Sequence, residues 1–206
     1  PLPGGDAAIR HPWRIAAAYV YSLLGPDAVP SWLFHSSPGA ESAFYRQIDR
    51  QINTPLTSSM GRLFDAVSAL LSICQTATYE AQAAIELEQV ANGQIGPLRW
   101  CSGSPFGRKS VSTGEDLGAR TPLYPFGVAE AGDGLVVRLR PLLAALLEEI
   151  RRGDLVSEIA WRFHVTVAQM IEQVCQQIRE QTGIRTAALS GGCFQNRLLV
   201  ELTVSL

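Results

Sequence analysis

The amino-acid sequence predicts an α/β fold that is mainly helical. Apolar residues recur at the three-to-four-residue spacing of helices through most of the chain. Only two short runs, residues 135–139 and 186–189, have the apolar character of strands. The 206 residues are 47% apolar, which is enough for a hydrophobic core and fits one domain or a large part of one.

The first two helices are predicted over residues 13–24 and around residues 44–52, with a loop over residues 27–40 between them. Pro12 suits the first position of a helix, because its fixed φ is helical and its missing N–H is not needed there. Gly25, followed by a proline, ends the first helix.

Two more helices are predicted before residue 93. Ser58 or Ser59 can cap the first of them. Its apolar face consists of Leu63, Phe64, Val67, Leu70, Leu71 and Cys74. The second begins near residues 79–82 and stops at Asn92-Gly93. Residues 92–122 hold six glycines and little periodicity, so we expect a loop insertion there.

The second half is predicted to be a strand, two helices, a short buried strand and a last helix. These lie at residues 135–139, 141–152, 154–181, 186–189 and from about 195 onward. Gly153 closes the first of these helices, and the second comes in one or two pieces. The residues expected to face inward on residues 154–181 are Ile159, Phe163, Val167, Met170, Ile171, Val174 and Ile178.

Composition excludes several classes of protein. The formal net charge is −2, so no polybasic surface predicts binding of nucleic acid or anionic lipid. No apolar run approaches the roughly 18 residues of a membrane span. The four cysteines do not stand at metal-ligand or redox spacing, which favours a reducing, cytoplasmic location. The three histidines are scattered, so no local metal site is predicted.

The sharpest local signal is the segment Ser190-Gly191-Gly192-Cys193-Phe194-Gln195-Asn196, between a predicted strand and a helix. Two glycines let the backbone turn tightly and approach a ligand, and the helix start favours an anion. Asn196, in the first turn, offers donors and acceptors to a ribose, base or acyl group. A plain strand-to-helix connection is the alternative. For Cys193, which has no paired histidine in the sequence, we favour an ordinary structural role.

Three further polar residues are candidates with ordinary alternatives. Asp65 stands at the border of an apolar helix face and could grip ribose hydroxyls, or be a surface carboxylate. Glu80 stands at a helix start, where it could contact a nucleotide or only favour the helix dipole. His164 lies on a largely apolar helix, where a packed or capping histidine is the expected reading.

Taken as a set, these motifs resemble the carbamoyltransferase domain of HypF-type hydrogenase maturation proteins. The matching blocks are Ser58–Val67 (SSMGRLFDAV), Tyr79–Ala84 (YEAQAA), Asp133–Leu142 together with Arg162-Phe163-His164, and Leu189–Leu199 (LSGGCFQNRLL). The blocks follow the family's order. One departure is Ala81, where the family usually has glycine.

The resemblance implies part of an actin-like (ASKHA) nucleotide-binding domain and a carbamoyltransferase activity. In this family a YrdC-like domain makes carbamoyl-adenylate from ATP and carbamoyl phosphate. The domain seen here passes the carbamoyl group to the C-terminal cysteine of the partner HypE, and the thiocarbamate becomes a cyanide ligand of [NiFe]-hydrogenase iron. The nucleotide-binding residues implied are Asp65, Glu80, Ser190, Gly191, Gly192 and Asn196; the resemblance assigns no catalytic residue.

The resemblance also implies a divalent metal in the complete protein, with a histidine cluster before Pro1 and an aspartate beyond Leu206. We therefore expect no metal ligands in this chain and no carbamoyl transfer by it alone. An open helix end at Leu206 and unpaired strand edges favour self-association of the segment. The alternatives are an O-carbamoyltransferase, a TsaD-like tRNA threonylcarbamoyl transferase, and a non-catalytic module that binds nucleotide or a partner protein.

Overall fold

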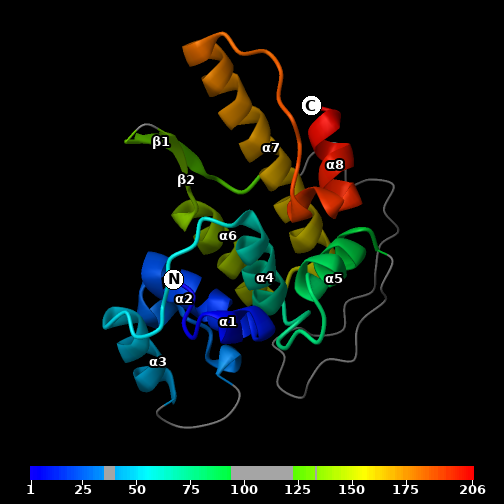
Figure 1. The fold of residues 1–206 in the computed structure, drawn as a ribbon. Coiled ribbons are helices and arrows are strands. Elements are labelled where there is room, and N and C mark those ends of the chain that lie inside the picture. Colours follow the sequence, from blue (N-terminus) through cyan, green and yellow to red (C-terminus); the bar gives the residue numbers. More distant parts are fainter. Residues whose placement is uncertain (35–39, 94–122, 133) are drawn as a thin grey trace. The chain divides into compact units, whose positions relative to one another are not determined.

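The protein is described by a computed structural model, which covers residues 1–34, 40–93, 123–132 and 134–206 (Figure 1). The described residues form two compact units. The first contains residues 1–34 and 40–89, and the second contains the remaining described residues. Apart from Asn92 and Gly93, the loop insertion predicted at residues 92–122 lies outside the described residues.

The first unit is helical. Its elements are α1 (Asp6–Arg10), α2 (Pro12–Leu24), the 3-10 turns η1 (Pro26–Ala28) and η2 (Ser31–Leu33), α3 (Ala40–Asp49), α4 (Met60–Leu70) and α5 (Gln82–Ala91), whose last two residues belong to the second unit. Helix α2 starts at Pro12 and stops before Gly25, as predicted. It packs on α4. Three successive alanines of α2, Ala16–Ala18, are fully buried, and their small side chains permit close packing around this helix.

Helix α4 is shorter than its apolar pattern predicts. The pattern runs to Cys74, but the helix ends at Leu70, and Ser72 has a left-handed φ of 56°. Cys74 is nevertheless buried, because the chain turns back over the helix end. Ser59 occupies the position before the helix, but its side chain caps no backbone N–H. Instead its own N–H donates to Thr57 Oγ1 at 3.1 Å.

The second unit combines one small sheet with helices. Its elements are β1 (Gly127–Ala131), β2 (Gly134–Arg138), α6 (Arg140–Arg152), α7 (Val156–Thr182), the 3-10 turn η3 (Gly192–Gln195) and α8 (Arg197–Val204). Strands β1 and β2 are antiparallel, with Gly127 opposite Arg138 and Ala131 opposite Gly134. The sequence predicts β2 within one residue but gives no sign of β1, whose Gly-Val-Ala-Glu-Ala run has few residues that favour strands.

A buried polar cluster holds the chain entering β1 against α6 and α7. Tyr124 donates its hydroxyl to Glu149 Oε2, and Arg162 Nη1 donates to Glu149 Oε1. The Tyr124 N–H donates to Thr166 Oγ1 at 3.1 Å. Burial, and then the hydrogen bond to Glu149, raise the pKa of Tyr124. Glu149 and Arg162 thus neutralise each other's charge within this cluster.

Helix α7 is one continuous helix, and only its first half is buried. Ile159, Phe163, Val167 and Met170 are at most 1% exposed, as predicted. The prediction is wrong for Ile178, which is 39% exposed. Its apolar spacing continues the pattern of the buried half, but periodicity shows which residues share a face and not whether that face is covered. The helix ends at Thr182, and the following residue, Gly183, has φ 75°.

The short strand predicted at residues 186–189 is wrong. Residues 183–190 are neither helix nor strand, and residues 184–190 are exposed. A strand is stabilised by hydrogen bonds to a neighbouring strand, and the sheet of the described residues contains only β1 and β2. The fold class is confirmed, since the described chain is mostly helical with one small sheet.

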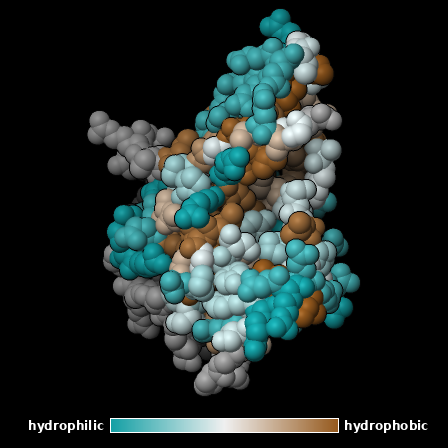
Figure 2. All heavy atoms as spheres, turned by 90° about the vertical axis from the view of Figure 1, so that its left-hand side faces the viewer, coloured by the Kyte–Doolittle hydropathy of each residue, from teal (hydrophilic) through white to brown (hydrophobic). Residues whose placement is uncertain are grey.

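No helix of the described residues has both the length and the apolar character that crossing a bilayer needs. Apolar side chains do reach the surface, as the brown areas of Figure 2 show. Val136, Ile184 and Val204 of the second unit are 50%, 58% and 72% exposed. Such exposure assigns no function by itself, because apolar atoms make up about half of ordinary protein surface.

Candidate nucleotide site

Asp65 lies on α4 and is only 4% exposed, so the surface carboxylate considered from its spacing is wrong. Its Oδ2 lies 2.9 Å from Arg62 Nη1, one helical turn earlier. Neither atom has a hydrogen-bond partner, so the pair is held by charge without hydrogen-bond geometry. Burial raises the pKa of Asp65 from 3.8 to about 6, and Arg62 opposes that rise. The fold keeps a carboxylate in a place that disfavours its charge.

Other polar groups gather around Asp65. Ser68, on the next turn of α4, is fully buried, and its Oγ has no hydrogen-bond partner. Tyr19 of α2 lies close enough that Arg62 lowers and Asp65 raises its pKa, on top of a larger increase from burial. Sequence reasoning missed Arg62 and Ser68. Their spacing of three residues on either side of Asp65 marks a polar row on an otherwise apolar helix, and that signal was available.

Glu80 lies in the exposed turn that precedes α5. The helix begins two residues later, and Gln82 Oε1 accepts hydrogen bonds from the Thr78 N–H and hydroxyl at 2.7 and 3.1 Å. Ala81 has φ 60°, a left-handed conformation that is strained for alanine and free of cost for glycine. In the described part of the chain, neither a hydrogen bond nor an ion pair joins Glu80 to Asp65.

The glycine loop is exposed and shaped by Gly191. This residue has φ 89° and ψ 172°, a region that essentially only glycine occupies. Gly192 differs, because its φ is ordinary and a Cβ built on it would meet no described atom within 4 Å. Neither conformation nor packing in the described chain therefore requires glycine at position 192. Ser190 is also exposed.

Asn196 is buried and precedes α8 as its N-cap, not within the first turn as predicted. Its Oδ1 accepts from the Leu199 N–H at 2.7 Å, and its Nδ2 lies 3.1 Å from His164 Nε2. His164 is fully buried, so the expected packed histidine is confirmed. Burial lowers the pKa of His164 to about 4, although the hydrogen bond to the Ala160 carbonyl acts in the opposite direction.

The predicted residues thus fall into two groups. Asp65 and Glu80 belong to the first unit, while Ser190, Gly191, Gly192 and Asn196 belong to the second. That both groups bind one ligand stays a prediction. Within residues 1–34, 40–93, 123–132 and 134–206, no three His, Cys, Asp or Glu side chains are grouped so that they could hold a metal ion. The described residues therefore do not fit a metal centre.

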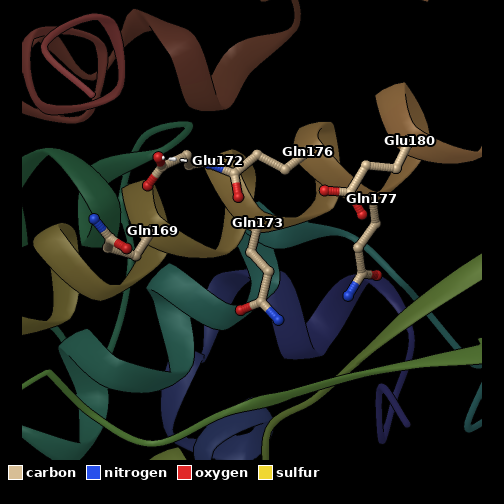
Figure 3. Close-up of a pocket in the computed structure, with 6 residues that line it drawn as sticks. All are labelled: Gln169, Glu172, Gln173, Gln176, Gln177 and Glu180. Atoms are coloured by element: carbon tan, nitrogen blue, oxygen red, sulfur yellow. Dashed lines mark hydrogen bonds between the residues drawn. The ribbon is translucent and has the colours of Figure 1, made fainter. Parts of the chain in front are cut away.

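A hollow on the surface of α7 contains none of these residues. It is lined by Gln169, Glu172, Gln173, Gln176, Gln177 and Glu180, all of the same helix (Figure 3). Gln176 Nε2 donates to Glu172 Oε1 at 2.9 Å. One helix face without opposing walls cannot enclose a ligand, so we do not assign the nucleotide to it.

Comparison with known proteins identifies the family. The whole chain, residues 1–206, matches the family model described as carbamoyltransferase, Kae1-like domain, second subdomain. Carbamoyltransferase HypF2 of Cupriavidus necator is 36% identical over 213 residues, which cover 98% of this chain and 24% of that protein. Carbamoyltransferase HypF of Synechocystis sp. is 30% identical over 220 residues, covering 99% and 25%.

Solved structures agree with these relatives. Full-length HypF in its phosphate- and nucleotide-bound form matches with a TM-score of 0.78 and 28% identity, over 99% of this chain and 28% of that one. HypF of T. kodakarensis matches with a TM-score of 0.69 and 26% identity, over 98% of this chain and 24% of that one. The chain spans about a quarter of the length of these proteins. It belongs to the HypF carbamoyltransferase family.

Proposed function

Since the chain belongs to this family, we propose that it supplies part of the adenylate site of a carbamoyltransferase. In the protein that carries it, a carbamoyl group would pass from carbamoyl-adenylate to the C-terminal cysteine of a HypE-type partner. ATP and carbamoyl phosphate would supply the adenylate through a YrdC-like domain. The thiocarbamate would then lead to the cyanide ligand of [NiFe]-hydrogenase iron. A solved relative that binds phosphate and nucleotide supports the nucleotide part of this proposal.

The observation that carries the proposal is the buried Asp65 carboxylate. Its Oδ2 has an ion pair but no hydrogen-bond donor, although a buried carboxylate oxygen normally has one. Ribose hydroxyls are donors that suit such an oxygen. We propose that Asp65 accepts hydrogen bonds from the ribose of the adenylate and that Arg62 keeps its carboxylate oriented. Glu80 would contact the adenosine from the exposed turn before α5.

The glycine loop supports the same proposal independently. The Gly191 and Gly192 N–H groups make no backbone hydrogen bond in the described part of the chain, and both residues are exposed. Successive free N–H groups in a turn form a cradle for anions. The open space beside Gly192 leaves room for the acyl-phosphate or the sugar to approach the backbone. We propose that residues Ser190 to Gly192 hold this part of the adenylate.

The chemistry asks the site mainly for positioning. The partner's thiolate attacks the carbamoyl carbon, a C–S bond forms, the bond from that carbon to the phosphate oxygen breaks, and AMP leaves. The thiol proton goes to a base that we do not assign among the described residues. Holding the adenylate in reach of the thiolate lowers the barrier without a strong acid or base. Binding, not proton transfer, is the role proposed for Asp65 and the loop.

Calorimetric titration with ATP tests the nucleotide site in the first instance. Asp65→Asn removes a charged acceptor and should weaken ATP binding about 10-fold to 100-fold. Gly192→Ala should weaken it about tenfold or more by filling the open space, without loss of stability, because alanine fits the local φ. Asp27→Asn, at an exposed position of η1, is the control and should bind like the wild type. Unchanged affinity in both site variants would contradict the proposal.

Transfer itself is tested by mass spectrometry of the partner's C-terminal cysteine. Full-length protein, ATP, carbamoyl phosphate and the partner should give a thiocarbamate, and the Asp65→Asn protein should need more ATP to reach the same rate. The 206-residue chain supplied with carbamoyl-adenylate should give none, because it carries only part of the site. A thiocarbamate formed by the chain alone would show that the site is complete within it.

A further inference from the structure

A chain of hydrogen bonds links the glycine loop to the interior of α7. Asn196, which follows the loop, lies against His164, a residue 32 positions earlier that sits on the buried half of α7. Helices α7 and α8 pack together, as Figure 1 shows. Both side chains are buried, at 8% and 0% exposure, so these bonds form away from water. In such surroundings the two groups strongly favour staying paired.

Backbone groups at the two ends of this series of hydrogen bonds decide which group donates and which accepts in each bond. The Leu199 N–H can only donate, so the Asn196 atom that faces it is Oδ1, at 2.7 Å. The Asn196 Nδ2 must then face His164 and donate to Nε2 at 3.1 Å. At the other end the Ala160 carbonyl can only accept, so His164 Nδ1 carries the proton and donates to it at 2.8 Å. A neutral ring is the form that can accept at Nε2 and donate at Nδ1.

We propose that His164 is a positioning residue for nucleotide binding: it fixes the Asn196 amide, and Asn196 fixes the turn that presents Gly191 and Gly192. This inference rests on the proposed function and adds a residue and a mode of action to it. Within the turn, the Phe194 N–H donates to the Gly191 carbonyl and the Asn196 N–H donates to the Cys193 carbonyl. Asn196 is therefore the last residue of the turn and the cap of α8 at once.

The same hydrogen bonds give Asn196 an indirect role in nucleotide binding in place of the direct contact that was expected. Both polar atoms of its amide already have partners within the second unit. It therefore acts on the nucleotide through the shape of the loop, and the ligand is met by the backbone N–H groups of the glycines. Burial keeps the pKa of His164 low, which preserves the neutral ring that this arrangement needs.

Two substitutions at position 164 separate positioning from packing. In His164→Gln, the amide oxygen reaches about the place of Nε2 and can still accept from Asn196. In His164→Asn, the shorter side chain reaches only about the place of Nδ1, so the acceptor is lost. Both remove the ring from a fully buried position and should lower the melting temperature. Val167→Ala, on the same buried stretch of α7, lowers stability without touching the hydrogen-bond chain and is the packing control.

The first measurement needs no nucleotide. Hydrogen exchange of the segment 190–200, followed by mass spectrometry, should speed up at least tenfold in His164→Asn, because the Leu199 N–H loses a firmly held cap. His164→Gln and Val167→Ala should keep the slow exchange of the wild type. Equal acceleration in all three variants, or in none, would mean that His164 only fills space, and the proposal would be wrong.

The second measurement is ATP affinity by calorimetry in the same proteins. His164→Asn should weaken binding about tenfold, the loss expected for one hydrogen bond, while His164→Gln and Val167→Ala stay close to the wild type. If both substitutions at position 164 weaken binding equally, or neither does, the positioning role is overturned. If the wild type binds no ATP, the proposed function fails instead, and the exchange result still decides whether His164 controls the loop.

Discussion

Replacing Asp65 by asparagine should stabilise the protein at neutral pH and leave it nearly unchanged in acid. Asparagine has the same shape but carries no charge to bury. Well below pH 3.8 the wild-type carboxyl is protonated in both the folded and the unfolded chain, so its burial adds no electrostatic penalty. As the pH rises, the unfolded chain ionises first, and the folded chain follows only at a pKa of about 6. The wild-type protein therefore loses stability as the pH rises from 3.8 to about 6.

The size of this loss follows from the pKa of Asp65. One pKa unit corresponds to about 1.4 kcal/mol, so a rise from 3.8 to about 6 corresponds to about 3 kcal/mol above pH 6. The attraction of Arg62 is already contained in that value. Asparagine gives up this attraction too and leaves Arg62 without a partner charge, so the gain in the variant should be somewhat smaller than 3 kcal/mol.

Urea unfolding at pH 4.5, 6 and 7.5 measures the effect. The quantity to compare is the unfolding free energy of Asp65→Asn minus that of the wild type, because other titrating groups cancel in the difference. This difference should increase by about 1–3 kcal/mol from pH 4.5 to 7.5. Asp27→Asn, at an exposed position, should give a constant difference. A constant difference for Asp65→Asn as well would refute the claim that burial raises its pKa.

Two further substitutions test local strain and buried charge by the same urea measurement. Ala81→Gly should stabilise the protein by about 0.5–1 kcal/mol, since glycine relieves the left-handed φ at 60°. Ala84→Gly, inside α5, is the control and should cost about 1 kcal/mol. A loss of stability in both variants would contradict the assigned turn. Glu149→Ala should cost about 3–5 kcal/mol because it leaves Arg162 buried without its counter-charge. Glu148→Ala, next to it and exposed, should stay within about 0.5 kcal/mol, and similar values for the two would disprove the buried cluster.

Local sequence signals predicted the helices well where both ends carry a marker. Helix α2 begins at Pro12 and stops before Gly25, and α6 stops before Gly153. Proline and glycine mark these ends through the conformation of their own backbone. Such signals need no knowledge of the rest of the chain. The strand expected at residues 186–189 depended instead on a neighbour to pair with, which no local pattern supplies. The prediction that the second half of α7 is buried was wrong for the same reason, because whether an apolar face is covered depends on the rest of the chain.

For the candidate site the sequence suggested a set of positions, which stay predictions, and no arrangement of them. Periodicity placed Asp65 at the edge of an apolar face, and its burial follows from the helix α2 that packs on α4. Asn196 was expected to face a ligand, while the structure uses its amide to cap α8 and to bind His164. A lone histidine in an apolar helix carries no sequence signal of a partner 32 residues away.

Two neighbouring polar residues of α4, Asp65 and Ser68, share an energetic property. Asp65 is buried in a place that disfavours its charge, and the Ser68 hydroxyl is buried without a partner. Each lowers the stability of the fold by itself. Packing alone would have been better served by leucine or alanine at these positions. A ligand that donates hydrogen bonds to these oxygens would turn both costs into binding energy, which is the expected trade between stability and function. Gly192, which neither packing nor conformation requires, fits the same reasoning.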